Sequence, residues 1–145
     1  MIRIILFLVL FLSIQTLCFG SSVKVISKHS VDDTVKLYEK ALKTAEVPLL
    51  LERSFKKKLP GGFSRMGKEL QFSNPFYGWS LGECHRGLRK DKPMSTKVYK
   101  DTNGQVWLEY VSPQDHVNSF GVIECGNETD KVRRILSGFA DSATE

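Results

Sequence analysis

The residue types that could perform chemistry in this chain are few, and they lie far apart in the sequence. Three cysteines and three histidines are present, and Cys84-His85 is the one adjacent pair among them. A zinc site needs three or four converging ligands, and neighbours on an extended chain point to opposite sides. Nucleophilic catalysis needs a nucleophile, a base and an orienting group, and neither a nucleophile elbow nor a phosphate-binding loop is present. We therefore expect no metal, no cofactor and no catalytic residue, with a thiol-dependent or hydrolytic enzyme using Cys84 or Cys125 as the alternative.

The first 20 residues have the order of a secretory signal peptide. The chain starts with Met1-Ile2-Arg3, continues with the apolar run Ile4 to Leu12, and has small residues at Gly20 and Ser21. The run is too short for a transmembrane helix, which needs ~20 apolar residues; an uncleaved anchor is the alternative. We predict cleavage near Gly20, which leaves residues 21–145 as one extracytoplasmic domain, periplasmic or secreted, with no membrane span.

The two cysteines that remain after cleavage are expected to form one disulfide. Cys18 leaves with the leader, and an even pair in an oxidising compartment favours a bridge between Cys84 and Cys125. Such a bridge closes a loop of roughly 40 residues, which stabilises the folded state by about 4 kcal/mol in the chain-entropy model. Two buried free thiols are the alternative, and a thiol count with and without reductant distinguishes the two.

The composition is that of one small globular domain with a mild positive charge. Hydrophobic residues make up 41% and charged residues 26% of the 145 residues. The net charge is +5, and it falls to +4 when the leader takes Arg3 away. This excess is too small to indicate nucleic-acid binding. The positive charge is densest in a basic cluster that we interpret either as a docking site for anionic lipid, polysaccharide or a partner, or as a solvated loop; its members are Arg53, Lys56, Lys57 and Lys58.

A short segment rich in aromatic residues is the strongest candidate for ligand binding. The predicted ligand-binding residues are Asn74, Phe76, Tyr77 and Trp79. Aromatic side chains with a polar group are common in pockets and interfaces, and the alternative is that they cover the edge of a sheet. The preferred function is a non-enzymatic module that binds a small molecule or a protein, and a homodimer through an exposed sheet face or edge is compatible with it.

Periodicity predicts the elements that must position these residues. Apolar positions from Val31 to Ala45 recur with helical spacing after the predicted N-cap Ser30. A second helix is predicted after Asn127, an N-glycosylation acceptor that we interpret as a helix cap, and Asp141 to Glu145 is predicted to be a frayed tail. Strands are predicted over residues 23–27, 47–51, 68–73, 96–100 and 105–111, the last two joined by an Asn-Gly turn.

The resulting order is strand, helix, four strands and helix. It predicts an α+β domain, β-α-β4-α, with an antiparallel sheet and its helices on one face. His29 and His116 are expected to face solvent beside helix starts.

The region from Leu70 to Pro113 resembles the domain of unknown function family 302. The matching features are Phe72-Ser73-Asn74-Pro75, Gly78, Pro93, Asp101 to Gly104, Val106-Trp107, Tyr110 and Pro113. The resemblance implies a fold similar to the TATA-binding-protein class and implies no activity. The chain departs from the family pattern in two places, since it has Glu52-Arg53-Ser54 where the family has an Ile-Asp-His step, and Trp79-Ser80-Leu81-Gly82 where the family has Thr-Pro-Leu-Met.

Overall fold

The computed structural model describes residues 22–73, 93–119 and 127–145. In chain order the elements are β1 (Ser22–Ser27), α2 (Val31–Thr44), β2 (Leu49–Lys58), the 3₁₀ turn η1 (Pro60–Gly62), β3 (Ser64–Phe72), β4 (Met94–Lys100), β5 (Val106–Val111), α3 (Pro113–Asn118) and α4 (Asn127–Thr144). None of the helices in these three ranges is both long and apolar enough to cross a membrane.

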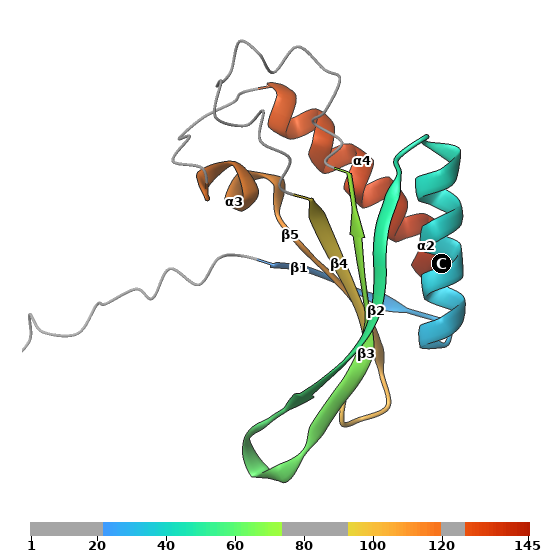
Figure 1. Cartoon of the computed structure of the whole chain (residues 1–145), viewed down its shortest axis with the longest axis vertical. Coiled ribbons are helices and arrows are strands. Elements are labelled where there is room, and N and C mark those ends of the chain that lie inside the picture. Colours follow the sequence, from blue (N-terminus) through green and yellow to red (C-terminus); the bar gives the residue numbers. More distant parts are fainter. Residues whose placement is uncertain (1–21, 74–92, 120–126) are drawn as a thin grey trace, which may run out of the picture.

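The strands form one antiparallel sheet in the order β1-β5-β4-β3-β2, with helices on one face (Figure 1). The predicted α+β class and the order β-α-β4-α are therefore confirmed, and α3 is an additional short helix between β5 and α4. Strands β1 and β2 lie at the two edges of the sheet. The ladder between β2 and β3 is the longest one and continues past the helices as a projecting hairpin (Figure 1).

Helix α2 begins where the sequence predicts it. The side chain of Ser30 accepts a hydrogen bond from the backbone N–H of Asp33 at 3.1 Å, which satisfies one free donor of the first turn. The buried side chains of α2 are Thr34, Val35, Tyr38 and Leu42, which recur at the spacing of one helical face.

The core lies between this face of α2, the inner face of α4 and the sheet. Tyr38 is at its centre, where its ring packs edge-on against Phe139 of α4, with ring centroids 6.0 Å apart, and in a tilted arrangement against Phe72 of β3, with centroids 5.9 Å apart. Its hydroxyl oxygen accepts a hydrogen bond from Thr96 of β4 at 2.9 Å, and burial raises the pKa of the phenol. Tyr38 thus connects both helices to the middle of the sheet.

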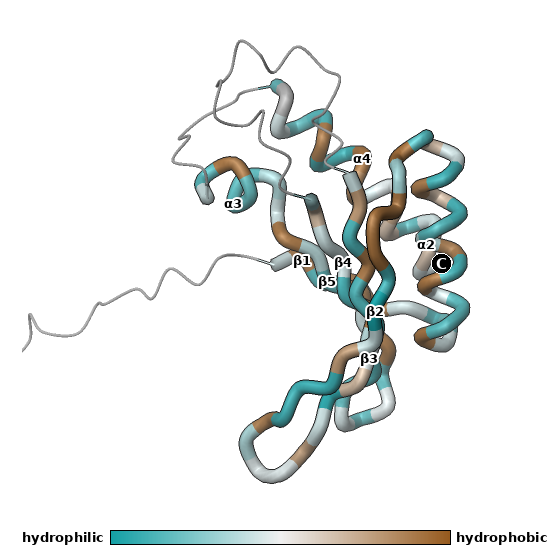
Figure 2. Tube along the Cα trace, in the orientation of Figure 1, coloured by the Kyte–Doolittle hydropathy of each residue, from teal (hydrophilic) through white to brown (hydrophobic). Residues whose placement is uncertain are grey.

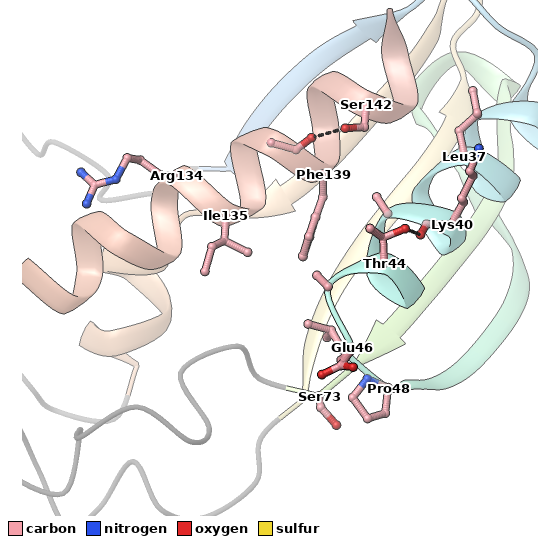
Figure 3. Close-up of a pocket in the computed structure, with 14 residues that line it drawn as sticks. Leu37, Lys40, Thr44, Glu46, Pro48, Ser73, Arg134, Ile135, Phe139 and Ser142 are labelled. Carbon is pink, nitrogen blue, oxygen red and sulfur yellow. Dashed lines mark hydrogen bonds between the residues drawn. The ribbon is translucent and has the colours of Figure 1, made fainter.

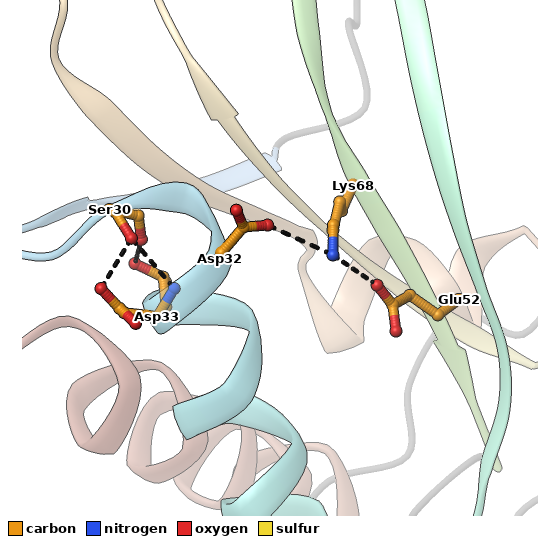
Figure 4. A network of polar contacts seen from close by, with 6 residues as sticks. Ser30, Asp32, Asp33, Glu52 and Lys68 are labelled. Carbon is orange, nitrogen blue, oxygen red and sulfur yellow. Dashed lines mark hydrogen bonds and ion pairs between the residues drawn. The ribbon is translucent and has the colours of Figure 1, made fainter.

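An ion-pair network holds the start of α2 to strands β2 and β3. Lys68 of β3 donates to Glu52 of β2 at 2.8 Å and lies 3.2 Å from the carboxylate of Asp32 in the first turn of α2 (Figure 4). The hydrogen bond from Lys68 lowers the pKa of Glu52, and the same bond raises the pKa of Lys68.

The β4–β5 hairpin is closed by one carboxylate, that of Asp101. Its Oδ1 atom accepts from the backbone N–H groups of Asn103 and Gln105, both at 2.9 Å, and its Oδ2 atom accepts from the indole of Trp107 at 2.8 Å. Gly104 has a φ of 84°, which the turn requires and glycine adopts without strain. The hairpin predicted from the Asn-Gly turn is confirmed, and Asp101 is the residue that fixes its geometry.

Replacing Asp101 by asparagine should lower the Tm at pH 7 by several degrees, because the amide cannot accept all three hydrogen bonds as a carboxylate does. The bond from Trp107 lowers the pKa of Asp101 in the folded state, so its stabilising effect is present above the unfolded value of about 4 and is lost as the pH falls through the folded value. Melting curves of both proteins between pH 7 and pH 2.5 should therefore converge at the acid end. A Tm difference that stays constant over this range would contradict the assignment.

Two expectations about the C-terminal part are wrong. Residues Asp141 to Thr144 are not a frayed tail, because α4 continues to Thr144, Ala143 is buried in the core, and the Thr144 carbonyl accepts from the N–H of Lys28 at 3.0 Å. His116 does not face solvent; it is only 5% exposed, because α3 packs its inner side against α4. The other helix-start histidine, His29, is half-buried.

Candidate functional site

A pocket of about 880 Å³ opens where α2, the segment that follows it and the side of α4 that faces α2 meet (Figure 3). The segment is Ala45 to Pro48, which joins α2 to β2. Ser73, at the end of β3, adds one more side of the pocket. A volume of this size fits a small organic molecule, since ligand pockets commonly measure about 300–1,000 Å³.

The middle of the pocket is apolar. Its apolar lining comprises Leu37, Ala41, Ala45, Val47, Pro48, Ile135 and Phe139. Figure 3 shows Ile135 and Phe139 pointing from α4 across the gap toward α2. The edge-on contact with Tyr38 fixes the ring of Phe139, so this wall is held in place by the core behind it.

Charged and hydroxyl side chains surround the apolar middle. The polar lining comprises Lys40, Thr44, Glu46, Ser73, Arg134 and Ser142. The hydroxyls of Thr44 and Ser142 donate to carbonyls of their own helices, at 2.9 Å and 2.8 Å. Within the described ranges, Lys40, Glu46 and Arg134 form no ion pair, so their charges are available to a ligand.

Glu46 occupies a backbone position that normally belongs to glycine. Helix α2 ends in a Schellman motif, in which the N–H of Val47 donates to the carbonyl of Leu42 at 2.9 Å and the N–H of Glu46 donates to that of Lys43 at 3.1 Å. Glu46 has a φ of 55°, which is in the left-handed region. This conformation destabilises the fold by about 1 kcal/mol for a residue other than glycine. A carboxylate is therefore held on the pocket wall at a cost in stability.

Replacing Glu46 by glycine should raise the free energy of unfolding by about 1 kcal/mol, because glycine adopts this φ without a steric penalty. Denaturant unfolding measures this change directly. Glu46→Ala is the matched control: it also removes the carboxylate, but it keeps the Cβ and should not be stabilised. Equal stability of the glycine and alanine variants would show that the backbone is not strained.

Gly138 is a second locally unfavourable residue in the pocket wall. It lies inside α4, where glycine is less favourable than alanine by about 1 kcal/mol. A Cβ at this position would contact nothing within 4 Å, and the φ of Gly138 is not positive, so neither packing nor backbone geometry requires glycine. Because glycine has no side chain, Gly138 leaves space in the pocket.

Several of the site residues predicted from the sequence lie outside the described residues. These are the aromatic-segment residues Asn74, Phe76, Tyr77 and Trp79, and the cysteines Cys84 and Cys125. Their proposed roles in ligand binding and in a disulfide stay predictions. Among the residues that the structure does describe, no group of three or more metal-ligating side chains lies together.

The basic cluster predicted from the sequence is described, and the structure divides it. The Nε and NH2 atoms of Arg53 contact one carboxylate oxygen of Glu69, at 2.7 Å and 2.6 Å, so Arg53 is neutralised within the sheet. Lys56, Lys57 and Lys58 are exposed and have no acidic partner among the described residues. The cluster lies at the far end of β2 from the pocket, so the two are separate surfaces.

The pocket itself has no direct signature in the sequence. Ile135 and Phe139 fall in the predicted inward stripe of the last helix, where their spacing indicates core packing. Two residues are nevertheless unusual for their positions. Glu46 follows a helix end, where glycine is preferred, and Gly138 lies inside a helix, where glycine is disfavoured.

The comparisons with known proteins identify the fold. The chain matches "Domain of unknown function DUF302" over residues 23–143. A crystal structure of an uncharacterized conserved DUF302 protein from Bacillus stearothermophilus superimposes with a TM-score of 0.67 and 20% identity, covering 84% of this chain and 97% of that one. A search of curated proteins finds no match. Because the match spans nearly all of the described domain, the chain belongs to the DUF302 family.

Proposed function

We propose that this domain is an extracytoplasmic binding module that holds a small amphipathic molecule in the pocket between α2 and α4, without catalysing its conversion. The signal-peptide pattern of the first 20 residues supports the extracytoplasmic location. The binding role follows from a pocket of ligand size with an apolar middle and charged margins.

The lining favours a ligand with an apolar body and polar groups at its ends. Ile135, Phe139 and Val47 offer apolar surface to the body. Lys40 and Arg134 lie at opposite margins of the pocket (Figure 3), and each gives its margin a positive charge that attracts an anionic group such as a carboxylate or sulfonate. Glu46 accepts from a hydrogen-bond donor at another part of the same molecule.

The observation that carries the proposal is that two locally unfavourable residues, from different elements, line the same pocket. Glu46 stands where glycine would be more stable, and Gly138 stands where alanine would be more stable. Each departure has a use in the pocket, since the first presents a carboxylate and the second leaves room. Departures from local preference at one place are typical of a functional site.

A binding role fits the lining better than a catalytic one. The described lining residues include no cysteine and no histidine, and Glu46 is the one carboxylate among them. General acid–base or nucleophilic catalysis needs at least two cooperating groups within hydrogen-bond distance, and no hydrogen bond joins two ionisable side chains of this lining.

Fluorescence titration with 1-anilinonaphthalene-8-sulfonate tests the proposal, because this probe combines an aromatic body, an anionic group and an N–H donor. Residues 21–145 contain all of the region that matches the family and are the form to use. We expect saturable binding of one probe molecule per domain. Lys40→Gln/Arg134→Gln should weaken it about fivefold to tenfold, the size expected for two exposed charge contacts.

The matched control is Lys36→Gln/Arg133→Gln, which removes the same charge from the same two helices at residues that do not line the pocket. This control should bind the probe as the parent does. Absence of saturable binding, or equal weakening by both double variants, would contradict the proposed site.

A further inference from the structure

The β2–β3 hairpin extends beyond the body of the domain and ends in a basic and apolar tip. We define the hairpin tip as residues Lys56 to Met66, which include the end of β2, the turn η1 and the start of β3. Figure 1 shows it projecting past both long helices. Because β2 has ten residues, the tip lies ~30 Å along the strand from the pocket at its other end.

The tip carries positive charge with no compensating acid. From Arg53 to Lys68 the sequence has no acidic residue. The two ends of this stretch are neutralised within the fold, since Arg53 pairs with Glu69 and Lys68 pairs with Glu52. The three lysines of the tip, Lys56, Lys57 and Lys58, have no ion-pair partner among the described residues.

The register of the hairpin distributes this charge around the tip. Lys56 and Lys58 are opposite Met66 and Ser64, whereas Lys57 is opposite Arg65, so the lysines alternate between the two faces of the hairpin. Arg65 stacks over the ring of Tyr99 at 4.2 Å, which directs it back to the sheet. A flat partner that contacts the end of the hairpin would therefore be within reach of lysines from both of its faces.

Large apolar side chains at the tip are exposed to solvent. Phe63, directly after the turn, is 59% exposed, and Met66 is 62% exposed. The turn is closed by a hydrogen bond from the N–H of Leu59 to the carbonyl of Phe63 at 2.8 Å, which fixes the backbone at the end of the hairpin. Figure 2 shows hydrophobic brown segments on the projecting hairpin between hydrophilic teal ones.

Protection of an edge strand explains only part of this arrangement. Lysines on an exposed edge prevent pairing with other chains, and β2 is an edge strand. Edge protection does not require an exposed phenylalanine at the end of the hairpin. A basic ring around an apolar end is instead the composition that binds an anionic bilayer, because the lysines attract headgroups while the apolar residues enter the interface.

We propose that the hairpin tip docks the domain end-on on an anionic lipid surface. Lys56, Lys57 and Lys58 contact the headgroups, and Phe63 enters the acyl boundary. The pocket at the opposite end of β2 stays open to solvent in this orientation, so docking and small-molecule binding are independent functions of one domain.

Vesicle flotation with residues 21–145 tests the proposal, since this form lacks the apolar leader. The domain should float with phosphatidylcholine vesicles that contain 30% phosphatidylglycerol at 50 mM salt. It should not float with pure phosphatidylcholine vesicles, nor with the anionic ones at 500 mM salt, where surface charges are screened. Equal flotation on neutral and anionic vesicles would overturn the proposal.

Variants of the tip separate docking through the hairpin from attraction by net charge alone. Lys56→Gln/Lys57→Gln/Lys58→Gln should weaken vesicle binding on the order of 100-fold, because each lysine near an anionic surface contributes roughly fivefold. Lys28→Gln/Lys36→Gln/Lys97→Gln removes the same charge from exposed lysines elsewhere and should weaken it by much less. Equal loss in the two triple variants would mean that net charge acts without a docking surface.

Phe63→Ala distinguishes a bilayer from a soluble polyanion. It should weaken vesicle binding roughly tenfold, since an exposed aromatic ring gains by leaving water, and it should leave binding to heparin unchanged. An unchanged affinity of Phe63→Ala for vesicles would contradict insertion of this ring into a bilayer. Unaltered melting of these variants and unaltered binding of the anilinonaphthalene probe would confirm that the fold and the pocket are intact.

Discussion

Gly67→Ala should lower the free energy of unfolding by about 3 kcal/mol and the Tm by roughly 10 °C. Gly67 lies in β3 opposite Tyr99 of β4, where the two strands approach so closely that a Cβ would overlap the Val98 carbonyl oxygen and lie 2.7 Å from the Tyr99 Cβ. Backbone atoms cannot swing away as a side chain does, so the ladder between β3 and β4 must open. Urea unfolding measures the loss.

Gly138→Ala is the matched control for this substitution, because the same added methyl group meets nothing within 4 Å there. It should raise the free energy of unfolding by about 1 kcal/mol through its better helix propensity. The same glycine-to-alanine change is therefore expected to lower the free energy of unfolding at position 67 and to raise it at position 138. A Gly67→Ala protein as stable as the parent would contradict the close approach of β3 and β4 at this position.

Gly138→Leu should separate stability from binding. Leucine is a good helix former, so the variant should be more stable than the parent by roughly 0.5–1 kcal/mol. Its side chain would extend into the pocket, because Gly138 lines the cavity and has open space around it. The affinity for 1-anilinonaphthalene-8-sulfonate should fall by about tenfold or more, since the probe and the new side chain compete for the same volume.

This combination excludes partial unfolding as the cause of the lost binding. Gly138→Ala provides the comparison again, because it should gain stability while retaining most of the probe affinity. A Gly138→Leu protein that binds the probe as well as the parent would show that the probe occupies another place. Thermal melts and fluorescence titrations on the same samples provide both quantities.

The fold was predictable where one face of an element is buried and the other is wet. Helix α2 and the β4–β5 hairpin follow from the spacing of residues such as Val35, Tyr38 and Leu42, and from the turn at Gly104. The length of β2 was not predictable, because residues 52–58 are mostly exposed on both faces and show no alternation. The end of α4 was missed because small core residues such as Ala143 give a weak apolar pattern.

The short helix α3 and the pocket could not be predicted from the sequence either. The N-cap Ser112 and the following Pro113 start α3, but the same two residues are equally typical of a strand end. The pocket needs Val47 and Ile135 on facing elements, and these residues are separated by most of the chain. Their proximity depends on the packing of α2 against α4, which no local pattern specifies.

Methyl NMR of residues 21–145 tests the central claim most directly. Addition of 1-anilinonaphthalene-8-sulfonate should shift the methyl signals of Ile135, Val47 and Leu37, which line the pocket, and should leave those of the buried sheet residues Val98 and Leu108 in place. Saturation of these shifts at one equivalent would establish the small-molecule site between α2 and α4. A bound probe that leaves the Ile135 and Val47 methyl signals unmoved would contradict it.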